Sequence, residues 1–380
     1  MLHTRQGRLT TGIILIVSTA LSGCKPGASD PGIQARILPI SVHCAPQKGQ
    51  AIDSNAVAAK ARSFAGLLNT EERGRLEAPF TRENAVRWSN LPVSSVQRQG
   101  VMLGDLDAAK QAAAEDLIQA VLSNCGSRMA EEIRLADEYI KPLSTRFAWG
   151  SGRYYVGFLG TPSGMSPWLL KIGGHHLAIN LTFNGRMPGA TPQFNGVEPI
   201  KFNVAGTEHE PMSRQSSAMA ALGAAIYPFP EARLVGTFTD VVKGVEYSIV
   251  PGPRLVGGND TTFPSVYPSG TAGRGVPFGK LSAADKRTVI EAISSFTDLS
   301  DGRMSKALFS DYTRPSALAG TYIGFSGSPD LTTENSYVRI DGPRLWMELV
   351  VQRAVAYPDQ LHFHAVWRDK EADYGGEFHH

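Results

Sequence analysis

Hydrophobic and polar positions along the first third of the chain repeat with helical spacing, and they predict four consecutive helices. Thr70 has the place of an N-cap, because acidic residues follow it in the first turn, and Pro142 ends the region. The four predicted helices cover residues 55–68, 70–76, 105–122 and 127–139. The pattern therefore predicts that the folded part of the chain starts with helices.

After residue 147 the pattern changes to short stretches in which apolar and polar residues alternate, as in strands separated by turns. Two further helices are predicted at 213–225 and 282–296, the second with Ser282 and Asp285 at capping-box spacing. Residues 251–279 are rich in Gly and Pro and predict a long irregular loop. The expected fold class is α+β: N-terminal helices and an antiparallel sheet with intervening helices.

Two segments in the strand-rich part of the chain each have a similar second copy further along. Residues 155–162 (YVGFLGTP) resemble 322–329 (YIGFSGSP), and 172–181 resemble 340–349. We expect two similar β-hairpin units, at about 150–200 and 318–370, that share one site; chance similarity between glycine-rich hairpins is the alternative. Aligning the units pairs unlike side chains: His176 with Arg344, and Asn180 with Glu348.

Alternation along the predicted strands assigns these side chains to faces of the sheet. On one strand Leu345, Met347 and Leu349 form the apolar face, so Glu348 belongs to the other face. By the same reasoning, His175 falls on an apolar face and His176 on the polar one.

A short strand at 361–367 carries the strongest candidate for chemistry. His362 and His364 lie two residues apart and share a face, so both imidazoles can bind one metal ion. The expected ligands are His176, His362, His364 and Glu348, and the expected ion is a divalent transition metal: zinc, iron, copper or nickel. Histidines bonded in a polar cleft, or exposed at the surface, are the alternatives.

Two arginines on the same predicted face change this picture, because guanidinium groups beside a divalent cation are unfavourable unless an anion neutralises them. Arg344 and Arg368 are therefore expected to bind a small anionic substrate. Glu348 and His176 complete the predicted catalytic set as general acid or base. Asp369 and Asp373 are candidates for orienting the histidine or arginine side chains; the alternative is that both belong to a solvated tail.

The composition narrows the class of protein. The chain has 380 residues, of which 42% are hydrophobic and 19% charged, as in a globular protein. Its 37 basic and 35 acidic residues give a net charge of +2, which argues against a nucleic-acid partner.

The first 23 residues have the pattern of a bacterial lipoprotein signal peptide, with basic residues followed by the short apolar run 12–21. Leu21-Ser22-Gly23-Cys24 resembles a lipobox, in which the Cys is lipidated. Residues 24–50 are expected to anchor and tether the domain at 51–380. The residue after Cys24 is Lys25 and not Asp, which would favour retention in the inner membrane. We therefore expect the protein to be anchored in the outer membrane, facing the periplasm. A simple secretory signal with a chance Cys is the alternative.

Two cysteines remain after Cys24 is assigned to the lipid. Cys44 and Cys125 would lie in an oxidising compartment, where a disulfide between them is expected. Two buried thiols are the alternative, because the sequence cannot show that their Cα atoms are close. No CxxC motif marks either as reactive.

Several separated motifs, in the same order, resemble the bacterial DUF3500 family of secreted or lipoprotein-type proteins from about residue 50 to 375. The motifs are RWSNLP at 87–92, the segment 167–180, FNGVEP at 194–199, HFHAVWRD at 362–369 and DYG at 373–375. The resemblance implies one continuous domain and a shared site, but no reaction. The sequence favours an envelope-anchored, hydrolase-like protein; a metal-buffering lipoprotein and a structural envelope module are the alternatives.

Overall fold

The computed structural model describes residues 53–144, 147–185, 189–241, 267–268 and 270–378, and every structural statement below concerns these residues. The predicted signal peptide, lipid anchor and tether lie outside them, as does most of the predicted loop at 251–279. Within the described ranges, no helix is both long and apolar enough to cross a membrane.

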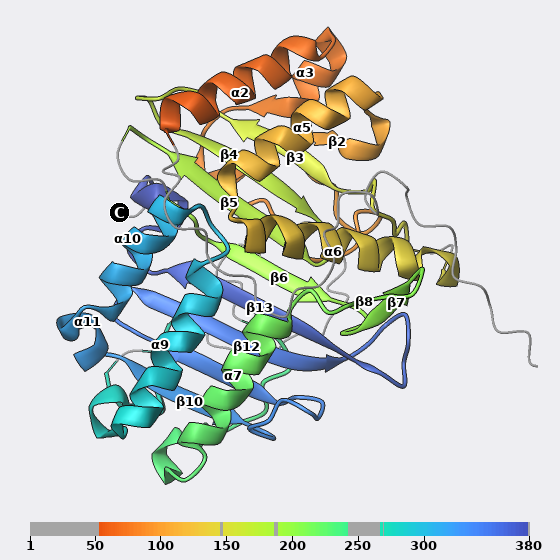
Figure 1. The fold of residues 1–380 in the computed structure, drawn as a ribbon. Helices are drawn as coiled ribbons and strands as arrows, with labels where there is room; N and C mark the ends of the chain where they lie inside the picture. The colour runs from red at the N-terminus through yellow and green to blue at the C-terminus, as the bar shows by residue number, and fades with distance from the viewer. Residues whose placement is uncertain (1–52, 145–146, 186–188, 242–266, 269, 379–380) are drawn as a thin grey trace, which may run out of the picture.

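Groups of consecutive helices and groups of consecutive strands follow one another along the described chain (Figure 1). The α-helices are α2 (Ser54–Leu67), α3 (Thr70–Leu76), α4 (Arg82–Ala85), α5 (Ala108–Val121), α6 (Asn124–Ile140), α7 (Ser213–Ile226), α9 (Ala283–Thr297), α10 (Gly302–Thr313) and α11 (Pro315–Ala319). The strands are β1 (Glu77–Ala78), β2 (Val101–Met102), β3 (Tyr155–Leu159), β4 (Trp168–Gly174), β5 (Leu177–Phe183), β6 (Gln193–Val197), β7 (Phe202–Val204), β8 (Thr207–His209), β9 (Val276–Pro277), β10 (Tyr322–Ser326), β11 (Tyr337–Asp341), β12 (Leu345–Arg353) and β13 (Leu361–Asp369).

One long sheet runs through the molecule in the order β1-β3-β4-β5-β6-β13-β12-β11-β10-β9, with β2 beside β3. Its described strands pair antiparallel except β1, which is parallel to β3. The predicted α+β class is therefore confirmed. Strands β6 and β13, far apart in sequence, meet at the centre of the sheet.

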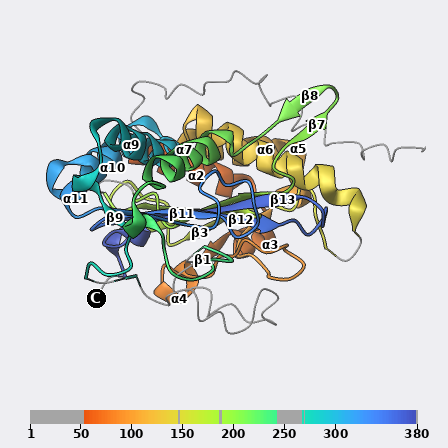
Figure 2. The ribbon, with the colours of Figure 1, turned by 90° about the horizontal axis from the view of Figure 1, so that it is seen from below.

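The two faces of the sheet are covered differently. Helices α5, α6, α7, α9 and α10 lie on one side of it, as Figure 2 shows. The second face carries a separate hydrophobic cluster in which Trp88, Leu234 and Phe238 pack on Trp346 and Val366 of the sheet. Because irregular segments cover this second face, the side chains predicted for the polar face are buried as well.

The predicted helices are confirmed to within a few residues, and all of them except α7 start at a residue whose side chain caps the first turn. The N-cap of α3 is Asn69, not Thr70: Asn69 and Glu72 form a reciprocal capping box. Ser282 caps α9 as predicted, accepting a hydrogen bond from the amide of Asp285. The helices α4, α10 and α11 were not predicted, because the first and last are short and α10 follows α9 almost directly.

Candidate metal centre

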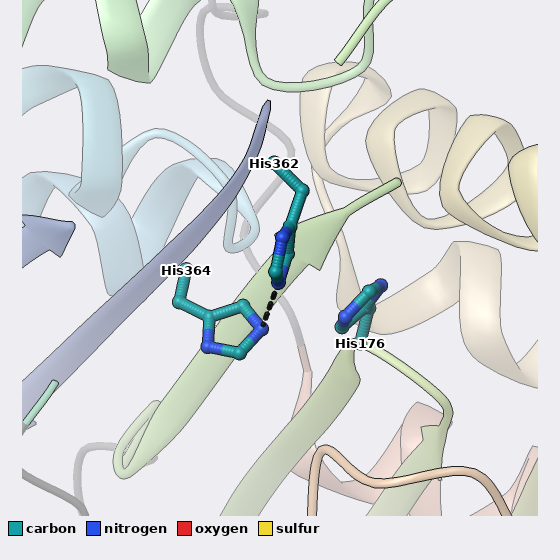
Figure 3. A group of neighbouring side chains, drawn as sticks. All are labelled: His176, His362 and His364. Carbon is teal, nitrogen blue, oxygen red and sulfur yellow. Dashed lines mark hydrogen bonds between the residues drawn. The ribbon is translucent and has the colours of Figure 1, made fainter. Parts of the chain in front are cut away.

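Three histidines from two distant parts of the chain meet at the sheet (Figure 3). His362 and His364 belong to β13, and strand geometry directs both to the same face, as predicted. His176 lies in the turn between β4 and β5. The pairing of β5 with β6, and of β6 with β13, brings this turn to the start of β13.

The three imidazoles are buried and close together. His176, His362 and His364 are 6%, 3% and 5% exposed, and each offers a ring nitrogen within 4.8 Å of the others. The Nε2 atoms of His362 and His364 are 3.1 Å apart. Their ring centroids lie 5.4 and 5.1 Å from that of His176. This part of the prediction, a three-histidine cluster, is realised in the structure.

His176 adopts a left-handed backbone conformation, with φ of 59°. A residue with a Cβ atom costs about 1 kcal/mol there, and such conformations persist where surrounding contacts fix them. Four hydrogen bonds hold the turn: Arg98 Nη2 to Gly174 O (3.0 Å), Tyr154 Oη to His175 O (2.7 Å), His176 N to Asn90 O (3.0 Å) and Gly196 N to His176 O (2.7 Å). These bonds therefore fix the backbone of the turn at His176.

The predicted separation of His175 and His176 onto opposite faces is wrong. Their rings stack with centroids 3.8 Å apart and an interplanar angle of 24°. Strand alternation fails here because the two residues form a turn between β4 and β5 rather than part of a strand. Nδ1 of His175 also forms a hydrogen bond with Oδ1 of Asp137 in α6, at 2.6 Å.

Gly196 of β6 gives the histidines room. A Cβ atom built on Gly196 would lie 2.9 Å from the carbonyl oxygen of Phe363, 3.0 Å from His364 Cδ2 and 3.1 Å from His176 Cδ2. Those distances are shorter than ordinary van der Waals contact. A side chain at this position would push the two rings apart, so the cluster requires glycine here.

A carboxylate orients one ring from outside the cluster. Asp240 Oδ1 lies 3.0 Å from Nδ1 of His364, and the Asp240 side chain is 13% exposed. A hydrogen bond of this kind places the proton on Nδ1 and leaves Nε2 as a lone pair, the arrangement that metal-binding histidines commonly share. The Asp240 segment belongs to the cover of the second sheet face.

The cluster fits a divalent transition metal ion. Burial, together with the neighbouring imidazole of His364, holds the pKa of His362 well below its ordinary value, so His362 is neutral as a ligand must be. Two nitrogens on a tetrahedral zinc ion lie about 3.3 Å apart, close to the Nε2 separation of His362 and His364.

Glu348 does not join the three-histidine group. Its side chain is completely buried on the predicted face, but its Oε2 accepts a hydrogen bond from Tyr337 Oη at 2.5 Å. Along β12, Glu348 is paired with Val366, whereas His364 is paired with Val350. The expectation that Glu348 is a ligand or base beside the histidines is therefore not supported by the geometry.

The two arginines predicted to clamp an anion lie at the far end of β13. Four residues separate Arg368 from His364, which is about 13 Å along a strand. Arg368 forms an ion pair with Asp373 at 2.7 Å. Arg344 pairs with Asp369 at 2.6 Å and with Asp311 at 2.9 Å. Internal carboxylates thus bind both guanidinium groups, and the structure does not gather them with His176 into one catalytic set.

Sequence reasoning missed three contributors to the cluster. Gly196 lies inside the FNGVEP motif at 194–199. A glycine at the centre of a buried strand could have indicated a close approach of other side chains. Asp240 and Asn90 had no signal, because each reaches the cluster through the packing of an irregular segment.

Some predictions concern residues outside those described. Cys24 and Cys44 are among them. Cys125, at the start of α6, is disulfide-bonded. Its pairing with Cys44 stays a prediction.

Comparison with known proteins gives a family and no activity. No curated protein and no solved structure matched the chain. The model of a family described as "Protein of unknown function (DUF3500)" matches residues 50–376, which include all three histidines, Gly196 and Asp240. The chain therefore belongs to the DUF3500 family.

Proposed function

We propose that this protein binds a divalent transition metal ion through His176, His362 and His364. One observation carries the proposal: three buried ring nitrogens converge within 4.8 Å of one another. Burying imidazole nitrogens is unfavourable unless they find partners, and a bound metal ion would supply one to each ring. Imidazole ligands suit zinc, copper, iron and nickel.

The favoured function is a metal-dependent, hydrolase-like activity on a small anionic substrate. Three protein ligands leave a coordination position open, as in catalytic rather than structural zinc sites. A bound ion would supply Lewis-acid activation of water or of a carbonyl or phosphoryl oxygen. The protein's part is to hold three neutral imidazoles, to orient His364 through Asp240, and to limit access of bulk water by burial.

A second candidate is a metal-binding or buffering protein without catalysis. Among the described residues no carboxylate belongs to the three-histidine group, and Glu348, the predicted general base, accepts a hydrogen bond from Tyr337 instead; both observations favour this candidate. The two functions differ in the fourth position: an exchangeable water supports the enzyme, and a fourth protein ligand supports storage.

Metal analysis of untagged protein tests the centre. We expect close to one equivalent of zinc or another transition metal, and its loss in both His362→Ala and His364→Ala. His209→Ala is the matched control, because His209 is a buried histidine bonded to Glu132, outside the cluster. Circular dichroism reports whether each variant folds. Folded variants that keep the metal of the wild type would refute the ligand assignment.

We also propose, from the lipobox pattern alone, that the protein is lipid-anchored at Cys24 and faces the periplasm from the outer membrane. Mass spectrometry of the mature N-terminus is expected to find a diacylated Cys24. Cys24→Ser should release the protein from the membrane fraction. An unmodified or earlier-cleaved N-terminus would contradict the proposal.

The similarity of the two sequence segments supports two repeated units that meet at β6 and β13. Each unit contains a four-stranded antiparallel meander, β3 to β6 and β10 to β13. A glycine, a basic residue and a polar residue stand in register across three strands of each unit: Gly157, Lys171 and Asn180 in one; Gly324, Arg339 and Glu348 in the other. In this arrangement the histidines lie where the two units join.

A further inference from the structure

A second polar cavity lies away from the histidines, beside β2 and the start of β3. Its volume is about 390 Å³, within the ~300–1,000 Å³ typical of sites for small organic molecules. A smaller pocket of about 20 Å³, with room for roughly one water molecule, shares some of its lining residues. Arg98, Gln99 and Tyr155 line both spaces.

Basic side chains dominate these walls. Arg75 and Arg98 line the outer cavity, while Arg87 and Lys171 line the inner pocket. Among the described residues that line the two spaces, Asp105 is the only acid, and it is exposed. The walls therefore carry a surplus of positive charge.

Arg98 has no carboxylate partner among the described ion pairs. Its Nη2 donates to three carbonyl oxygens, of Ser89 (2.9 Å), Leu91 (2.5 Å) and Gly174 (3.0 Å). Its Nε is buried and lacks an acceptor, as Gln99 Oε1 lacks a donor. A buried charged donor without an acceptor is costly unless a ligand or solvent supplies one.

Lys171 adds to the positive charge behind Arg98. Its Nζ donates to the carbonyl oxygens of Asn84 (2.8 Å), Ala85 (3.3 Å) and Arg87 (2.6 Å). Burial, and then the charges of Arg98 and Arg87, lower the pKa of Lys171 to about 7. Burial also lowers the pKa of Arg98 to about 10, which still leaves that guanidinium charged at neutral pH. Both shifts are the response expected where positive charges are buried without a counter-ion.

We propose that the cavity beside β2 and β3 binds a small organic anion, a carboxylate or a phosphate ester of about monosaccharide size. The anionic group neutralises Arg98 and is attracted by Arg75, and a hydroxyl of the ligand donates to Gln99 Oε1. None of the three histidines lines this cavity, although Arg98 also contacts the turn that carries His176, and we expect anion binding not to require a bound metal ion.

Isothermal titration calorimetry of the intact protein, with and without EDTA, tests the proposal. The probes are glucuronate, glucose 6-phosphate and, as the neutral control, glucose. We expect saturable binding of at least one anion, unchanged by EDTA, and no binding of glucose. Preference between the two anions distinguishes a carboxylate from a phosphate ligand. Binding of glucose as strong as that of the anions, or no binding of either anion at millimolar concentration, would overturn the proposal.

A charge reversal at the cavity wall locates the binding. Arg75→Glu should weaken anion binding at least about tenfold, because an attraction becomes a repulsion. Arg75 is exposed and pairs with Glu71 on its own helix, so the variant is expected to fold. Arg287→Glu on α9 makes the same charge change on an exposed residue away from the cavity and should leave binding unchanged. Equal losses of anion affinity in the two variants would mean that the anions respond only to the overall charge of the protein, which would contradict binding in this cavity.

Discussion

Raising the pH from 7.5 to 9.5 is expected to stabilise the protein through Lys171. Burial, with Arg98 and Arg87, lowers the pKa of this lysine from 10.5 in the unfolded chain to about 7 in the folded protein. Between those values the unfolded state binds one more proton than the folded state, so the free energy of unfolding rises with pH. Well below pH 7 both states are protonated at this site, and its contribution no longer changes.

The magnitude follows from the two pKa values. Each pH unit inside the window contributes at most ~1.36 kcal/mol for one proton. Because the folded amine is still partly protonated at pH 7.5, the expected gain between pH 7.5 and 9.5 is about 2.5 kcal/mol. Such a change is a large fraction of the stability of an ordinary domain.

Urea unfolding followed by tryptophan fluorescence at several pH values measures this gain. Lys171→Met should lack this gain, whatever its stability at any single pH. The two proteins share all other titrating groups, so the difference between their pH dependences of the free energy of unfolding isolates the contribution of Lys171. Lys306→Met on α10 removes an exposed lysine and should keep the wild-type slope. If wild type and Lys171→Met give parallel curves across this window, the inferred pKa of Lys171 is wrong.

Three further predictions concern the cluster and the disulfide. Asp240→Asn should lower zinc affinity about 10–100-fold, because losing a carboxylate that orients a ligand histidine typically costs this much. Competition with a chromophoric chelator measures the affinity, and an unchanged value would exclude the orienting role of Asp240. Gly196→Ala should also weaken zinc binding in that assay, whereas Gly279→Ala, where an added Cβ meets nothing within 4 Å, should not; equal effects would refute the steric argument. Peptide mapping without reduction should find Cys125 linked to Cys44, and any other partner for Cys125 would contradict that pairing.

The helices and the strand faces were predictable because they depend on local spacing. The alternation in β12 directs Leu345 and Met347 to the helix-covered core and Trp346 to the second face, as the sequence indicated. The same alternation correctly placed His362 and His364 side by side on β13. It failed at His175 and His176, because a turn with a left-handed residue does not alternate.

The anion clamp failed for a different reason. A shared strand face says nothing about distance along the strand or about which carboxylates fold back. Arg344 lies against α10, where Asp311 and Asp369 bind it, so it is not on the predicted polar face. Arg368 pairs with Asp373 at the same end of β13. Glu348 likewise accepts a hydrogen bond from Tyr337 on the neighbouring strand.

The sequence by itself determined the family resemblance, the α+β class, the lipobox pattern and the histidine pair on one strand, because each depends on residues close together in the chain. Only the tertiary structure decided that His176 joins the pair, that Asp240 orients it and that Gly196 leaves it room. Those contacts cross between strands and covering segments far apart in sequence, and their existence depends on strand order and packing, which no local pattern specifies.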